Sequence, residues 1–164
     1  MNLFAAEIQP WLQPPSGDVQ LVLFADEQLH LDEPDVKRHI AGCVKYARQY
    51  SVHLVSGLFA LDGCLCLALF SPKGEPICLQ KAIHLALPLR HSLHTGERVE
   101  VVNTPLGNLC LCVDVDIFCP EVARTAALKG ADILLSIQHL DPVDDTHERL
   151  MSSVWNAAQS NNLY

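Results

Sequence analysis

The sequence predicts a single α/β domain in which strands that are apolar on both faces alternate with amphipathic helices. The runs from Val19 to Ala25 and from Leu109 to Val115, the second interrupted only by Asp114, are typical of strands buried inside a parallel sheet or a sandwich. The second run turns directly into a helix at Pro120, and the pair Asp62-Gly63 between two apolar runs indicates a β-hairpin. With 164 residues, the chain is long enough for one domain with a core of its own.

The first half of the chain is expected to hold two strands and one long helix. A strand over residues 2–8 ends at Pro10, and a Pro-rich loop leads from it to the strand at Val19. A helix that runs to about residue 50 is predicted next, with Asp32 or Asp35 as its N-cap and Pro34 in its first turn. Its apolar residues recur at helical spacing, which favours one buried face.

Strands are predicted to dominate the middle of the chain. They are expected over residues 53–60, 64–70 and 76–81, followed by an irregular segment over residues 84–96 and a short strand over residues 99–102. The helix that starts at Pro120 has Glu121 in its first turn and stops at Gly130. A further strand over residues 133–137, a loop over residues 138–145 and a last helix from about Thr146 complete the prediction.

Composition excludes several classes of function. The formal net charge is -8, with 19 acidic and 11 basic residues and no basic stripe, so nucleic acid is not an expected partner. No apolar run has the length of a membrane span, and no signal peptide is evident. The seven cysteines lie largely within strands, as small core residues do, which favours a cytoplasmic protein with reduced thiols. No cysteine and histidine set has the spacing of a zinc finger, and no Gly-rich phosphate loop is present, so neither a metal site nor a cofactor is predicted.

The stretch around the second buried strand resembles the nitrilase (carbon–nitrogen hydrolase) superfamily. In that family a Gly-x-x-Gly-x-x-Ile-Cys-Tyr-Asp strand is followed by Pro-Glu-x-x-Arg and an Ala-rich helix that ends in Gly-Ala-Asp. The matching residues here, which align without a gap, are Gly107, Asp116, Pro120, Glu121, Arg124 and Gly130-Ala131-Asp132. The resemblance implies an α-β-β-α sandwich, present here as one partial domain over residues 1–164. The first helix of the family and its C-terminal strands are lacking.

The resemblance also implies a pocket with a Glu base, a Lys that stabilises an oxyanion and a Cys nucleophile. The ungapped alignment puts Asp114 at the Cys, Asp26 at the Glu and Ala82 at the Lys. Two near neighbours, Glu27 and Lys81, sit one residue out of register and would face away in an extended strand unless a bulge re-aims them.

A rival register takes Cys112 as the nucleophile, because a shift of two residues keeps the same face of the strand. In addition, Arg90 stands where a second, substrate-positioning Glu of the family is expected. The pattern of departures favours a catalytically inactive domain with a structural, regulatory or subunit role. The alternative is a working amidase or nitrilase that acts through a Cys thiolate with Lys81 and Glu27.

The missing strands also imply something about partners. Their neighbours would present unpaired edges and an uncovered apolar face. We therefore expect a homo-oligomer, a complementing protein chain, or a chain that is a remnant of a larger gene product. A small amide, nitrile or amine that pairs with Asp114 and Arg90 is a further candidate ligand.

Overall fold

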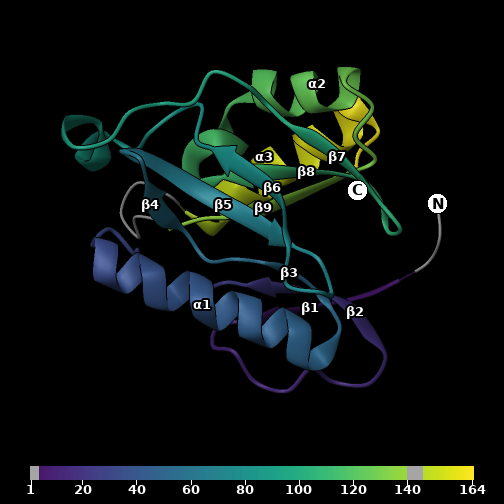
Figure 1. The fold of residues 1–164 in the computed structure, drawn as a ribbon. Helices are drawn as coiled ribbons and strands as arrows, with labels where there is room; N and C mark the ends of the chain where they lie inside the picture. Colours follow the sequence, from purple (N-terminus) through teal and green to yellow (C-terminus); the bar gives the residue numbers. More distant parts are fainter. Residues whose placement is uncertain (1–3, 140–145) are drawn as a thin grey trace.

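The computed structural model describes residues 4–139 and 146–164 and has four layers, ordered helix, sheet, sheet, helix (Figure 1). One outer layer is helix α1 (Glu33–Tyr50), and the other is formed by α2 (Pro120–Leu128) and α3 (His147–Asn161). The predicted α-β-β-α sandwich is thus confirmed. No helix within the described ranges is long and apolar enough to cross a membrane.

The six-stranded sheet, here called sheet A, is built entirely from the first half of the chain. Its strands are β1 (Ala5–Gln9), β2 (Val19–Phe24), β3 (His53–Val55), β4 (Phe59–Leu61), β5 (Cys64–Phe70) and β6 (Pro76–Lys81). Strands β1, β2 and β3 are parallel, whereas β5 is antiparallel to β3, β4 and β6. The connection between β1 and β2 contains no helix, as the Pro-rich loop predicted.

The smaller sheet, here called sheet B, has the order β7-β8-β9. Its strands are β7 (Val101–Thr104), β8 (Gly107–Val113) and β9 (Ile133–Ile137). Strand β8 is antiparallel to β7 and parallel to β9, and helix α2 makes the crossover between the parallel pair. A 3-10 helix, η2 (Asp114–Phe118), links β8 to α2, and a second one, η1 (Leu87–His91), follows β6.

Three apolar clusters hold the layers together. Between the sheets, Leu21 and Leu23 of sheet A pack against Leu109, Leu111 and Val113 of sheet B. A second cluster joins the opposite face of sheet A to α1, and a third joins the outer face of sheet B to α2 and α3. Because side chains alternate along a strand, each strand residue belongs to either the inter-sheet face or an outer face, and this parity decides where the functional candidates lie.

Several predicted elements differ from those observed. The strand expected over residues 53–60 is split into β3 and β4, and the strand expected over residues 109–115 ends at Val113 because Asp114 turns the backbone into η2. The strand expected over residues 99–102 is found at Val101–Thr104. Residues 2–3 of the first expected strand and residues 140–145 of the expected loop lie outside the described residues.

The turn before β6 predicts a strong and specific glycine effect. Gly74 has a φ of +71°, and an added Cβ would lie 2.9 Å from the Val44 carbonyl oxygen and 2.7 Å from Nε of Arg48. We expect Gly74→Ala to lower the free energy of unfolding by about 2–3 kcal/mol, because left-handed strain and a clash with the backbone add up. Urea denaturation will measure it. Gly17→Ala is the control, since Gly17 has a φ of +55° with nothing within 4 Å, so strain alone costs about 1–2 kcal/mol.

Candidate functional site

The end of β8 is a sharp elbow centred on Asp114. This residue is 2% exposed and has a φ of +52°, a left-handed conformation that side-chain-bearing residues rarely adopt. One of its carboxylate oxygens accepts a hydrogen bond from the backbone N–H of His139, just after β9, at 3.0 Å. A strained residue at a strand-to-helix turn is a common position for a reactive group. Here that position holds a buried carboxylate and no thiol.

Asp116, two residues after Asp114, links the elbow at the end of sheet B to the loop that follows β6 of sheet A. Its carboxylate is 1% exposed and accepts the backbone N–H groups of Ile83 and His84 at 2.9 and 2.8 Å. A third bond comes from Nδ1 of His84, at 2.9 Å. Burial raises the pKa of Asp116, and these hydrogen bonds partly oppose the shift. The loop after β6 is therefore fixed onto the elbow by one acidic side chain.

The lysine position of the alignment is filled by an apolar side chain. Ala82 is fully buried and packs in the inter-sheet cluster. Lys81 is paired with Cys66 of β5, and Cys66 belongs to the cluster that faces α1. Because paired residues of neighbouring strands point to the same face, Lys81 lies on the α1 face of sheet A. No irregularity near Lys81 would turn its side chain to the other face, since the only register shift in the pairing of β5 with β6 lies between Leu69 and Phe70.

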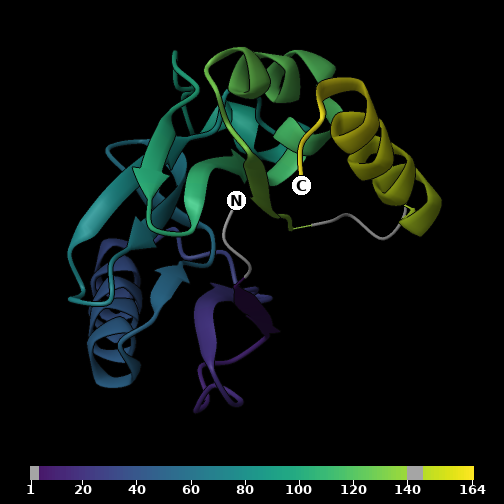
Figure 2. The same cartoon turned by 90° about the vertical axis from the view of Figure 1, so that its right-hand side faces the viewer.

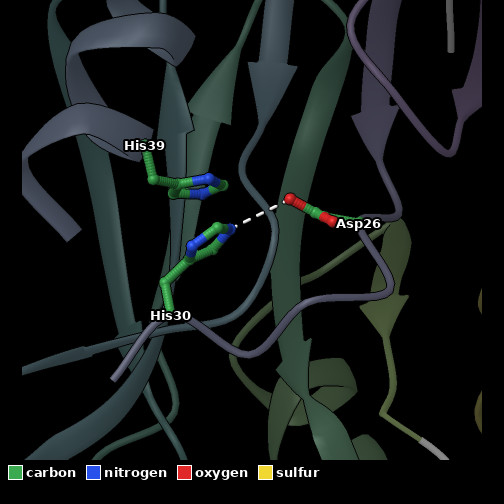
Figure 3. Close-up of side chains that lie close together, drawn as sticks. All are labelled: Asp26, His30 and His39. Carbon is green, nitrogen blue, oxygen red and sulfur yellow. Dashed lines mark hydrogen bonds and ion pairs between the residues drawn. The ribbon is translucent and has the colours of Figure 1, made fainter. Parts of the chain in front are cut away.

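Asp26, directly after β2, points to α1 (Figure 3). One oxygen of Asp26 accepts the Gln28 N–H at 3.0 Å, and the other lies 2.9 Å from Nε2 of His30. The remaining ring nitrogen of His30, Nδ1, lies 2.5 Å from a carboxylate oxygen of Asp35. Glu27 is exposed to solvent.

His30 stacks on a second buried imidazole from α1 (Figure 3). The ring centroids of His30 and His39 are 4.0 Å apart, and the rings are inclined by 29°. Burial lowers the pKa of His30, but the hydrogen bonds to Asp35 and Asp26 outweigh burial and raise it overall. Burial and the charge on His30 lower the pKa of His39 to about 4, so His39 is neutral at pH 7. The pKa values of the two stacked rings are thus shifted in opposite directions, and His39 is the neutral ring at pH 7.

Cys112 and Lys81 are not brought together. Cys112 is 1% exposed and packs in the cluster between sheet B and the α2 and α3 layer, so its thiol points away from the inter-sheet space. Lys81 lies on the opposite outer face, that of sheet A. The shifted-register site built from Cys112, Lys81 and Glu27 would therefore need a rearranged sandwich.

The burial of Cys112 predicts its reactivity. Burial raises the pKa of its thiol well above the usual range, so the thiolate is scarce at neutral pH. We expect iodoacetamide at pH 7.5 to leave Cys112 unmodified in the folded protein, whereas the half-buried Cys119 reacts slowly. Peptide mass mapping after a timed exposure will show this, with urea-unfolded protein as the reference in which both residues react. Fast native labelling of Cys112 would contradict the packing described here.

Sequence reasoning missed both polar clusters. The first cluster forms because α1 covers the face of sheet A that contains β2, and its members are Asp26, His30 and His39. The second cluster lies at the elbow, where donor atoms within 4.8 Å of one another come from His84, Cys119 and Glu121. The one available signal was the helical spacing of Val36, His39 and Cys43, which places a histidine on the buried face of α1. Nothing in the local sequence points to the partners.

Known proteins resemble this chain in their three-dimensional structure, whereas comparison of the sequence finds no match. No family model and no curated protein matches this chain. Among solved structures, a cysteine-to-alanine mutant of the amidase from Nesterenkonia sp. AN1 in complex with butyramide has a TM-score of 0.76 at 20% identity, covering 88% of this chain. Nit3 of Saccharomyces cerevisiae, a member of branch 10 of the nitrilase superfamily, has a TM-score of 0.70 at 20% identity, covering 89% of this chain.

These similarities show that the chain shares the fold of these solved structures over part of their length. The chain covers 61% of the amidase structure and 60% of Nit3, so it spans about three fifths of the length of these proteins. A further mutant of the same amidase shows Michael addition of acrylamide at its active-site cysteine, with a TM-score of 0.73 and 20% identity over 88% of this chain and 63% of the amidase.

Proposed function

We propose that this protein is a catalytically inactive nitrilase-fold subunit whose second sheet is completed by another protein chain, in the first place a second copy of itself. The observation that carries the proposal is the carboxylate of Asp114 on the elbow where the aligned family has its thiol. A carboxylate is a poor nucleophile toward amides, because its attack would give an anhydride.

The other aligned positions support the loss of chemistry. Ala82 cannot stabilise an oxyanion, and the carboxylate of Asp26 is engaged by His30 on the α1 side of sheet A. Nucleophile, oxyanion donor and base are thus all altered, while the buried Asp116 that fixes the elbow is retained. An elbow that keeps Asp116 while the aligned reacting groups are replaced supports an inactive subunit.

The subunit role rests on the unequal sizes of the two sheets. Strands β1 and β2 extend beyond sheet B (Figure 2). Ile8 of β1 pairs with Leu23, which belongs to the inter-sheet cluster, and yet Ile8 is 70% exposed. An exposed large apolar residue on a face that is otherwise core indicates a surface awaiting a partner.

The edge of β9 supports the same conclusion. The backbone of Tyr164 forms two hydrogen bonds with the start of this strand, to Leu134 at 2.9 Å and to Asp132 at 3.0 Å. By alternation the backbone of Ser136 faces the same edge, where none of the described strands pairs with it. Beside this edge lies a hollow of about 290 Å³, lined mostly by apolar side chains, among them Leu23 and Val154. A strand added at this edge could form hydrogen bonds with the backbone of β9 and pack its apolar side chains into the hollow.

Incubation with acrylamide and fluoroacetamide, followed by intact-mass measurement and an ammonia assay with short-chain amides, tests the loss of activity. We expect no ammonia release. We also expect the protein to form an adduct no faster than glutathione, a simple reference thiol, does. A stoichiometric adduct together with amide turnover would overturn the proposal.

A second candidate function, amide or nitrile hydrolysis through a thiolate, is favoured by one observation. Cys119 and His84 lie together at the start of α2, and Asp116 accepts the Nδ1–H of His84, which directs Nε2 outward. Burial and nearby carboxylates, however, raise the pKa of the Cys119 thiol, which disfavours the thiolate. Adduct formation that Cys119→Ser abolishes would establish this second function.

Light scattering coupled to size-exclusion chromatography tests the subunit role. We expect association that depends on concentration and that Ile8→Lys reverses, because a charge would be buried at the uncovered inter-sheet face. Leu128→Lys is the matched control, since Leu128 is 73% exposed on α2, away from that face. A wild-type monomer at every concentration would exclude a second copy as the completing chain.

A further inference from the structure

We propose that Asp26, His30 and His39 form a binding site for one divalent transition-metal ion of the Zn²⁺ class, between β2 and α1. This inference is independent of the proposed function, because the site lies on the α1 side of sheet A and uses neither the elbow nor the open edge of β9. Donor atoms from the three side chains all lie within 4.8 Å of one another. All three residues are at least partly withdrawn from solvent, with the side chains of His30 and Asp26 7% and 18% exposed.

The arrangement places the three donors on one side of the stacked rings (Figure 3). His30 Nε2 and the Asp26 oxygen already face each other at 2.9 Å, and His39 extends from α1 above the His30 ring. Zn²⁺ takes nitrogen and oxygen ligands at about 2.0–2.2 Å, so ligand atoms around it lie roughly 3.3 Å apart. Rotation of the His39 ring about its side-chain bonds, with His30 held by Asp35, would close the remaining gap.

Each donor has a second contact of the kind that supports metal ligands. Nδ1 of His30 lies 2.5 Å from the Asp35 carboxylate, which would hold the ring tautomer that leaves Nε2 for a metal. His39 has a backbone hydrogen bond to Gly57, and the second oxygen of Asp26 accepts the N–H of Gln28. A carboxylate–histidine–metal arrangement of this type orients the ring and makes it a better ligand.

Charge also fits a divalent cation. Without a metal, the His30 ring lies between the carboxylates of Asp26 and Asp35, and Arg38 also forms an ion pair with Asp35 at 3.0 Å. On binding, the ion takes the place of the Nε2 proton of His30, and that proton passes to solvent. The carboxylate of Asp26 then places a negative charge directly on the ion, Asp35 lies behind His30, and His39 binds as a neutral ring. Two imidazoles with one carboxylate are a ligand set for Zn²⁺ that leaves a fourth position for water.

The test is titration of the metal-free full chain with Co²⁺ and Zn²⁺ under reducing conditions, followed by visible absorption and calorimetry. We expect one equivalent to bind, with d–d bands of a low-coordinate site. Asp26→Asn and His39→Gln should each abolish that binding. Asp35→Asn should weaken it about 10–100-fold, as loss of an outer-shell partner does. His91→Gln is the control, because His91 is exposed on η1 and lies outside the cluster.

Two outcomes would overturn the proposal. One is the absence of a bound equivalent at micromolar ion concentrations. The other is binding that survives Asp26→Asn and His39→Gln but is lost in His84→Gln, which would assign the ion to the cluster of His84, Cys119 and Glu121. Nitrogen-15 NMR of the imidazoles in the unaltered chain gives the same answer without any variant, since Zn²⁺ must shift the His30 and His39 resonances first.

Discussion

Replacing Asp116 with alanine is expected to lower the free energy of unfolding by about 3–5 kcal/mol, because three partly buried donors would lose their buried acceptor at once. Two of these donors are the backbone N–H groups of Ile83 and His84, and the third is the His84 ring. The loop after β6 would also lose its attachment to the elbow. Asp116→Asn should recover part of the loss, since its carbonyl oxygen still accepts.

Urea denaturation followed by circular dichroism will measure this effect. Asp132→Ala is the matched control, because Asp132 is also an aspartate that accepts from backbone and side-chain N–H groups, those of Asn108, but it is exposed. Water replaces its bonds, and we expect a loss of no more than about 1 kcal/mol there. Equal losses in the two variants would show that burial of Asp116 is not what matters.

Leu111→Ala should cost about 2–5 kcal/mol, because it opens a cavity in the centre of the inter-sheet cluster. Leu111 is 1% exposed and lies on the face of β8 that meets Leu65 and Leu67 of sheet A. The surrounding side chains can relax only partly around the gap. The thermal unfolding midpoint and the urea midpoint should both fall.

The surface counterpart Leu128→Ala separates burial from residue type. Leu128 is 73% exposed at the end of α2, and its truncation should change stability by no more than about 0.5 kcal/mol. A small effect at Leu111 would mean that the two sheets are not tightly packed. The proposal for an association surface next to this core would then lose its basis.

Local chemistry explains why much of the fold was predictable. The helix over residues 33–50 follows from Pro34 in its first turn and from its apolar spacing, and the hairpin follows from Asp62-Gly63, where both residues have positive φ. The strand predicted over residues 109–115 ends at Val113, because Asp114 adopts a left-handed conformation in which its carboxylate accepts the N–H of His139. The residue type alone does not predict this conformation, since aspartate adopts left-handed conformations in only a minority of cases.

Parity explains what could be predicted of the site. The sequence placed Lys81 one residue out of register, and strand alternation puts it on the α1 face, with Ala82 in the inter-sheet core. The same alternation puts Cys112 on the outer face of sheet B. The contacts of Asp26 with His30 and of Asp116 with His84 were beyond prediction, because loops and layers that are separate in sequence bring them together.

The two halves of the sandwich are encoded by consecutive segments of the chain. Sheet A and α1 use residues 5–81, whereas sheet B, α2 and α3 use residues 101–161. During synthesis the first half therefore emerges complete, with Leu21, Leu65 and Leu67 exposed until the second half arrives to cover them. We expect the nascent chain to be most prone to aggregation, and most dependent on chaperones, in that interval.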